Sequence, residues 1–123
     1  MPTATLTLPA APEQARTARL VAGAAARRAG VDEEAVDDVR LAVAEAMARA
    51  AFRSRDNPTG LVRIDLSDDL ESFEIRITDG RDIGVENDEQ GLALSLIRAL
   101  APHARIVSAE PGEALVLGWP TTR

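Results

Sequence analysis

The chain has 123 residues and a formal net charge of -6, which predicts one compact domain spanning residues 1–123. All 14 basic side chains are arginines, and the sequence has no lysine, no cysteine and a single histidine, His103. These absences exclude a Walker A phosphate-binding loop, a lysine Schiff base, thiolate chemistry and a zinc site with paired imidazoles. Any chemistry must therefore use carboxylates, arginines, backbone groups or shape.

The negative charge is concentrated in the second half of the chain. Residues 1–60 are neutral, whereas residues 61–123 carry 12 acids against 6 arginines, with five of these acids between Asp79 and Glu89. Such a surface repels phosphate backbones, so we expect no direct binding of nucleic acid. It suits a basic protein partner or a cation, and a solvated acidic loop is an equal alternative.

Location and source are indicated only by composition. No apolar run reaches the roughly 18 residues needed to cross a bilayer, and the first residues lack a secretory signal. We therefore expect a cytoplasmic protein with no membrane contact. The abundance of alanine and arginine without lysine is typical of a high-GC genome, such as that of an actinobacterium.

The first half of the chain predicts one strand and two helices. Residues 3–8 alternate as in a half-buried strand. A helix is expected over residues 12–29, with Leu20 and Ala24 on one face and Gly30 as its stop. Asp32 is a good N-cap for a second helix that ends near Phe52. The apolar stripe expected on this second helix is Val36, Val39, Val43, Met47 and Ala50.

The second half predicts a hairpin, a short helix and a second hairpin. Residues 61–66 and 73–77 alternate and form the first pair of strands. Residues 91–100 are an apolar helix, and residues 105–109 and 114–119 form the last two strands. We expect Trp119 to close the core and His103 to lie at the surface.

The predicted order of elements indicates the fold class. Paired strands mixed with helices favour an α/β protein of the α+β two-layer sandwich type. The expected architecture is a mixed, largely antiparallel five-stranded sheet with three helices on one face.

Two segments resemble a known family. Residues 36–51 read VDDVRLAVAEAMARAA and residues 91–100 read GLALSLIRAL. They resemble the conserved helix and the second glycine box of the anti-sigma factor and switch-protein serine kinases, which have the histidine kinase-like (GHKL, Bergerat-fold) ATPase domain. Between them, Asp79 and Gly80 follow a predicted strand, where the family has an aspartate. The resemblance covers nearly the whole chain and implies a Bergerat-like fold.

The resemblance also implies roles for individual residues. Glu45 takes the place of the general base that acts on a serine of the partner protein. Asp79 takes the place of the aspartate that binds the adenine amino group, and Gly80, Gly84 and Gly91 are candidates for the nucleotide loops. Arg49 stands where the family has the asparagine that holds magnesium.

The sequence departs from the family pattern at this nucleotide site. Arg49 has no acceptor atom and cannot ligate a metal, so we expect no protein metal ligand here. It has two other interpretations: an ion pair with Glu45 one turn earlier, or direct contact with a phosphate. Arg81 and Ile83 replace two glycines of the usual D-x-G-x-G pattern, and Ala93 replaces a glycine of the second box.

These departures favour a retained scaffold with a degenerate ATP site. The resulting hypothesis is a regulatory protein-binding module that binds a sigma factor and/or a STAS-domain antagonist, with binding of ATP and magnesium weakened or lost. The alternatives are an active ATP-dependent serine kinase of the same family and a dimerisation module that forms a homodimer. The arginines of the first helix either pair with an acidic partner surface or solvate that helix: Arg16, Arg19, Arg27 and Arg28.

Overall fold

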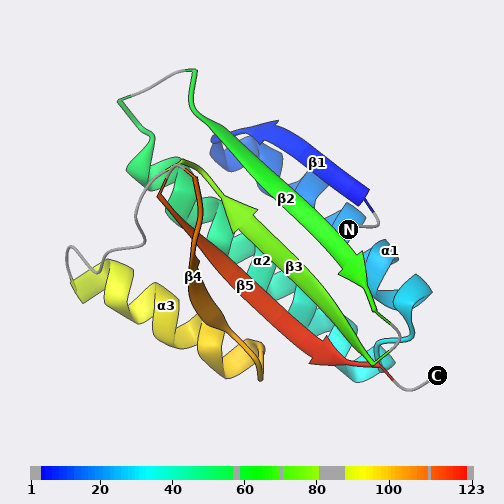
Figure 1. Cartoon of the computed structure of the whole chain (residues 1–123). Helices are drawn as coiled ribbons and strands as arrows, with labels where there is room; N and C mark the ends of the chain where they lie inside the picture. The colour runs from blue at the N-terminus through cyan, green and yellow to red at the C-terminus, as the bar shows by residue number, and fades with distance from the viewer. Residues whose placement is uncertain (1–3, 57–58, 70, 81–87, 111, 122–123) are drawn as a thin grey trace.

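A five-stranded sheet with helices packed on one face makes up the computed structural model, which describes residues 4–56, 59–69, 71–80, 88–110 and 112–121 (Figure 1). The order across the sheet is β1-β2-β3-β5-β4, and each of these neighbouring pairs is antiparallel. The expected fold class is confirmed, and no parallel pair occurs within the described ranges. The strands are β1 (Ala4–Pro9), β2 (Leu61–Asp68), β3 (Ser72–Thr78), β4 (Arg105–Ser108) and β5 (Glu113–Pro120).

Three α-helices form the second layer. A short 3-10 turn (Pro12–Gln14) leads into α1 (Ala15–Ala29), which ends at Gly30 in the left-handed conformation with φ 93°. The second helix, α2 (Glu33–Arg53), follows directly, and α3 (Asp88–Leu100) packs beside it. In Figure 1, α1 and α2 cross behind the sheet. No helix in these described segments is both long and apolar enough to cross a membrane.

The long helix α2 is the centre of the core. Every residue of its predicted apolar stripe is buried, and the stripe faces the inner side of β2, β3 and β5. The helix begins where Asp32 predicted, although the Asp32 side chain makes no capping hydrogen bond. It ends at Arg53, one residue beyond the predicted end.

Helix α1 packs through its smallest side chains and not through the face that carries Leu20 and Ala24. Leu20 is 56% exposed and Ala24 is exposed as well. Small side chains let α1 approach α2 closely, which a leucine face would prevent. The buried residues of α1 are Ala18, Ala22, Gly23, Ala26 and Ala29.

Trp119 closes the core, as predicted. It is 1% exposed, its ring centroid lies 6.5 Å from that of Phe73, and its Nε1 donates a hydrogen bond of 3.0 Å to the carbonyl oxygen of Leu100. The end of β5 is thereby joined to the end of α3. His103 is exposed, also as predicted. On α3, Leu94 and Ile97 are buried and Leu96 is exposed.

The turn between β2 and β3 gives a prediction about acid stability. The Asp69 carboxylate accepts hydrogen bonds from the Ser72 N–H at 2.8 Å, the Ser72 hydroxyl at 3.0 Å and the Glu71 N–H at 3.3 Å. These bonds, led by that of the Ser72 N–H, hold the pKa of Asp69 below its ordinary value. The stability that they supply is therefore present above the unfolded-state pKa and lost as the pH falls through the folded-state pKa.

We expect Asp69→Asn to flatten the acid side of the stability curve, because the amide cannot gain a proton in this range. The measurement is urea unfolding at a series of pH values from about 6 to about 2. Glu71→Gln removes a neighbouring exposed charge and is the matched control. Equal slopes in wild type and Asp69→Asn would contradict this account.

Candidate functional site

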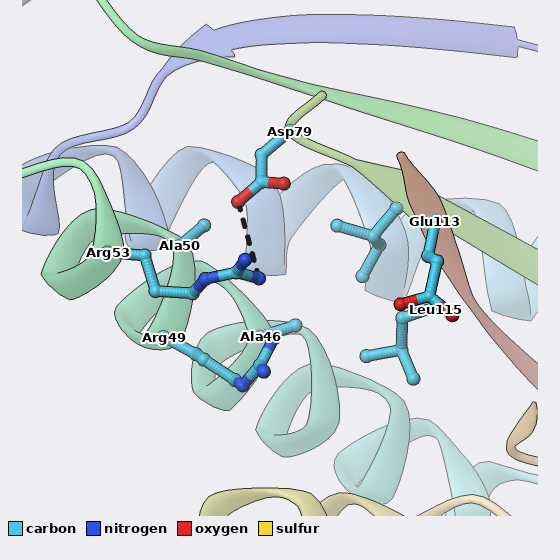
Figure 2. Close-up of a pocket in the computed structure, with 8 residues that line it drawn as sticks. Ala46, Arg49, Ala50, Arg53, Asp79, Glu113 and Leu115 are labelled. Carbon is cyan, nitrogen blue, oxygen red and sulfur yellow. Dashed lines mark ion pairs between the residues drawn. The ribbon is translucent and has the colours of Figure 1, made fainter. Parts of the chain in front are cut away.

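A narrow pocket lies between the C-terminal half of α2 and the ends of β3 and β5 (Figure 2). Helix α2 supplies two arginines and two alanines, and the sheet supplies two carboxylates and two aliphatic side chains. The cavity that remains among them is about 20 Å³, which is room for about one water molecule. The lining residues are Ala46, Arg49, Ala50, Arg53, Ile77, Asp79, Glu113 and Leu115.

An ion pair between Arg53 and Asp79 crosses this pocket. The Nη1 atom of Arg53 lies 3.9 Å from Oδ2 of Asp79, and the two side chains are only 6% and 9% exposed. Figure 2 shows Arg53 reaching from α2 toward Asp79, which follows the last residue of β3. Because both charges have lost most of their water, the ion pair is a substantial part of what compensates each of them.

Arg49 lies in the same pocket, one helical turn before Arg53. Residues four apart share a helix face, so both guanidinium groups come from one side of α2. Arg49 is buried, whereas Glu45 is half-buried. The ion pair expected between Glu45 and Arg49 is not among those formed by the described residues, and this prediction is wrong. The four-residue spacing predicts such a pair for side chains on an exposed helix face, whereas Arg49 is buried under the sheet.

Among the residues that the structure describes, the space left in this pocket is small for a nucleotide. Pockets that hold small molecules usually have volumes of about 300–1,000 Å³, far above the space found here. The carboxylate of Asp79 is engaged by Arg53, and Arg49 offers donors but no oxygen for a metal. No cluster of three or more acidic, histidine or cysteine side chains suited to a metal occurs in the part of the chain that the structure describes.

The structure places the remaining candidate residues as follows. Gly80 adopts φ 80° directly after Asp79, a left-handed conformation that favours glycine. Gly91 lies in the first turn of α3, where side chains are outside the described set, and Gly84 falls outside the described residues. Glu45 lies one turn before Arg49 on α2 and does not line the pocket. Of the predicted residues that the structure describes, Arg49 and Asp79 line this pocket together, and Gly80 directly follows Asp79.

Two charged residues of this pocket were missed by the sequence interpretation. Arg53 continues the spacing of Glu45 and Arg49 by a further four residues, and this spacing was a usable signal. Glu113 is the first residue of β5 and faces the pocket from the sheet. No local pattern indicates its role, because its position depends on how β5 pairs with β3.

Comparison with known proteins identifies the fold family. Residues 8–119 match the histidine kinase-like ATPase domain, and the chain belongs to this family. It is also similar to the serine-protein kinases RsbW of Listeria monocytogenes serotype 4a and Listeria innocua serovar 6a. Each is 33% identical over 90 residues, which cover 70% of this chain and 56% of the relative. The chain thus spans about half the length of these curated relatives, and the family expected from the two sequence segments is confirmed.

Proposed function

We propose that the chain is a regulatory protein-binding module of the anti-sigma type, in which ATP binding is weakened or lost. Its partner would be a sigma factor and/or a STAS-domain antagonist. The observation that carries this proposal is the buried ion pair between Arg53 and Asp79. By the sequence resemblance, Asp79 takes the place of the aspartate with which the family binds adenine, and here its carboxylate forms an ion pair within the chain itself.

The energetics of that ion pair oppose nucleotide binding. For adenine to reach Asp79, the carboxylate would have to leave Arg53, and the guanidinium would have to move out of the pocket. Separating a buried pair leaves each charge without that partner, and removing one partner of such a pair typically costs about 3–5 kcal/mol. A nucleotide would need to recover this free energy before any net affinity appeared.

Arg49 adds a second reason. The bridging magnesium of such a site needs an oxygen ligand, and a guanidinium in its place repels the cation. Phosphoryl transfer depends chiefly on positioned phosphates and metal. The remaining role of the scaffold is then to present a surface to another protein.

The alternative is an active serine kinase, and two observations favour it. The relatives are named serine-protein kinases, and the sequence resemblance gives Glu45 on α2 the place of the general base. In that case Asp79 would have to exchange Arg53 for adenine when nucleotide binds.

Titration with Mg·ATP by calorimetry separates the two functions. We expect the wild-type protein to bind with a Kd weaker than about 1 mM, which is a binding free energy smaller than about 4 kcal/mol. The paired variant Arg49→Asn with Arg53→Ala should bind at least about tenfold more tightly, because it frees Asp79 and enlarges the pocket. Arg55→Ala removes an exposed arginine from the next turn and serves as the control. Micromolar binding by the wild type would establish the kinase alternative instead.

The partner is tested separately. Native mass spectrometry of the purified chain with each sigma factor and STAS-domain protein encoded in the same genome should show a one-to-one or two-to-one complex. If no protein of either class forms a complex, the regulatory proposal is wrong.

A further inference from the structure

A second groove lies on the helical layer and shares no lining residue with the pocket that contains Arg53 and Asp79. It is an open groove of about 570 Å³ between the first half of α1 and the first half of α2. We call it the α1–α2 groove, and Figure 1 shows these two helices side by side behind the sheet. Its lining residues are Arg16, Arg19, Leu20, Asp37, Arg40 and Leu41.

The arginines of α1 divide into two kinds. Arg27 is satisfied within the chain by Glu33, with Nη2 to Oε1 at 2.7 Å, and this bond raises the pKa of Arg27. Arg16 and Arg19 are exposed in the groove, and neither forms an ion pair with a described residue. Arg27 therefore has its partner within the chain, whereas both interpretations stay open for Arg16 and Arg19.

The groove has an excess of positive charge on an acidic chain. Arg40 joins Arg16 and Arg19, and the only carboxylate in the lining is Asp37, which lies 3.3 Å from Nη1 of Arg40. Three guanidinium groups thus face one carboxylate, on a protein whose net charge is -6. This local reversal of sign favours an acidic ligand.

Arg40 is held in place by the absence of a side chain at Gly23. A Cβ atom at Gly23 would lie 2.6 Å from Nε of Arg40, so the arginine passes over the helix backbone only because α1 has glycine there. The Nε atom is buried and forms no hydrogen bond within the described segments. This packing fixes the side chain and presents its outer nitrogens to the groove.

Two leucines form the apolar part of the groove. Leu20 is 56% exposed and Leu41 is 53% exposed, and each lies next to an arginine of the lining in sequence. Exposed leucines bordered by cations are complementary to a segment that has apolar residues on one face and acids beside them.

We propose that the α1–α2 groove is the docking surface for an acidic amphipathic helix of a partner protein. Apolar side chains of that helix would cover Leu20 and Leu41, and its carboxylates would pair with Arg16, Arg19 and Arg40. A second copy of this chain fits less well, because a two-fold contact would place these arginines against themselves. The inference rests on the proposed function only in requiring that the partner be a protein.

The test uses a defined probe, so it does not depend on knowing the partner. The probe is a fluorescein-labelled helical peptide of leucine, alanine and glutamate, with leucines at helical spacing and glutamates beside them. Anisotropy at low salt should give a Kd of about 10–100 μM with the wild-type chain. The same peptide with lysine for glutamate should bind at least about tenfold more weakly.

Variants then locate the binding surface. Arg16→Glu with Arg19→Glu should weaken binding at least about tenfold, because it reverses the charge of the groove. Arg28→Glu makes the same kind of change on α1 outside the groove and should leave the Kd unchanged within about twofold. Gly23→Ala moves Arg40 without altering any charge, and should weaken binding about threefold. Urea unfolding of each variant shows that the fold is retained.

The outcomes separate this inference from the proposed function. The docking proposal is wrong if the wild type does not bind the probe, or if the Arg16→Glu, Arg19→Glu variant binds it equally well. It is also wrong if sedimentation shows a homodimer that this same variant abolishes. If a sigma factor or STAS-domain protein binds wild type and variant equally, the groove is wrong and the proposed function stands. If only the peptide binds, the groove stands and the proposed function fails.

Discussion

Replacing Arg53 with methionine should lower the free energy of unfolding by about 3–5 kcal/mol, one of the two largest effects that we expect in this chain. The substitution leaves the carboxylate of Asp79 in a pocket where its side chain is only 9% exposed, 3.9 Å from where the guanidinium nitrogen had been. Methionine fills a similar volume, so the loss comes mainly from taking the ion-pair partner away from a buried charge rather than from a cavity.

A double-mutant cycle isolates the ion pair. Asp79→Leu alone leaves the buried guanidinium of Arg53 without this carboxylate and should be similarly destabilising. The double variant Arg53→Met, Asp79→Leu should recover most of the loss, because neither member of the pair is then left without the other. Unfolding in urea, followed by circular dichroism, measures all four proteins.

Arg55→Met is the matched control for this cycle. Arg55 is exposed, with Nη1 2.7 Å from the carbonyl oxygen of Phe52 and its guanidinium 4.3 Å from the Phe52 ring centre. Its replacement should cost about 1 kcal/mol or less. If Arg53→Met lowered the free energy of unfolding no more than this control, the ion pair would not contribute the expected stability.

The fold was largely predictable because its signals are local. The alternation in residues 61–66 and 73–77 and the stripe on α2 each describe one element that buries one face. The exception is α1, where Leu20 and Ala24 share one helix face as predicted but both are exposed, so that face is not the one that packs. The competing face consists of alanines and Gly23, and its burial depends on how closely α2 approaches, which no spacing within α1 reveals.

The candidate site was predictable only in part, because its decisive contact joins distant residues. Arg53 and Asp79 are far apart in sequence and belong to different layers of the fold. The predicted helix ended near Phe52, so Arg53 fell just outside it, at the kind of boundary that sequence patterns locate least well. With that residue left out, Arg49 had only Glu45 as a visible partner.

Replacing Trp119 with alanine should also lower the free energy of unfolding by about 3–5 kcal/mol. The ring is 1% exposed and packs against Phe73, and nearly all of its surface would be replaced by a cavity. Trp119→Phe keeps most of the ring but leaves the carbonyl oxygen of Leu100 without its donor, and should cost about 1–3 kcal/mol. Circular dichroism in urea is the readout, because Trp119 is the only tryptophan.

The comparison between the two Trp119 variants separates two contributions to stability at the end of β5: the packing of the ring and the hydrogen bond to Leu100. The strand begins at Glu113, in the pocket that contains Arg53 and Asp79, and near its end Trp119 donates a hydrogen bond to the last residue of α3. Leu96→Ala, on the exposed side of α3, should change stability by about 0.5 kcal/mol or less and controls for helix propensity. If Trp119→Phe were as harmless as Leu96→Ala, packing of the ring alone would join β5 to α3. If Trp119→Phe clearly lowered the free energy of unfolding, the hydrogen bond would help to hold α3, the helix that contains Gly91, in its place beside α2.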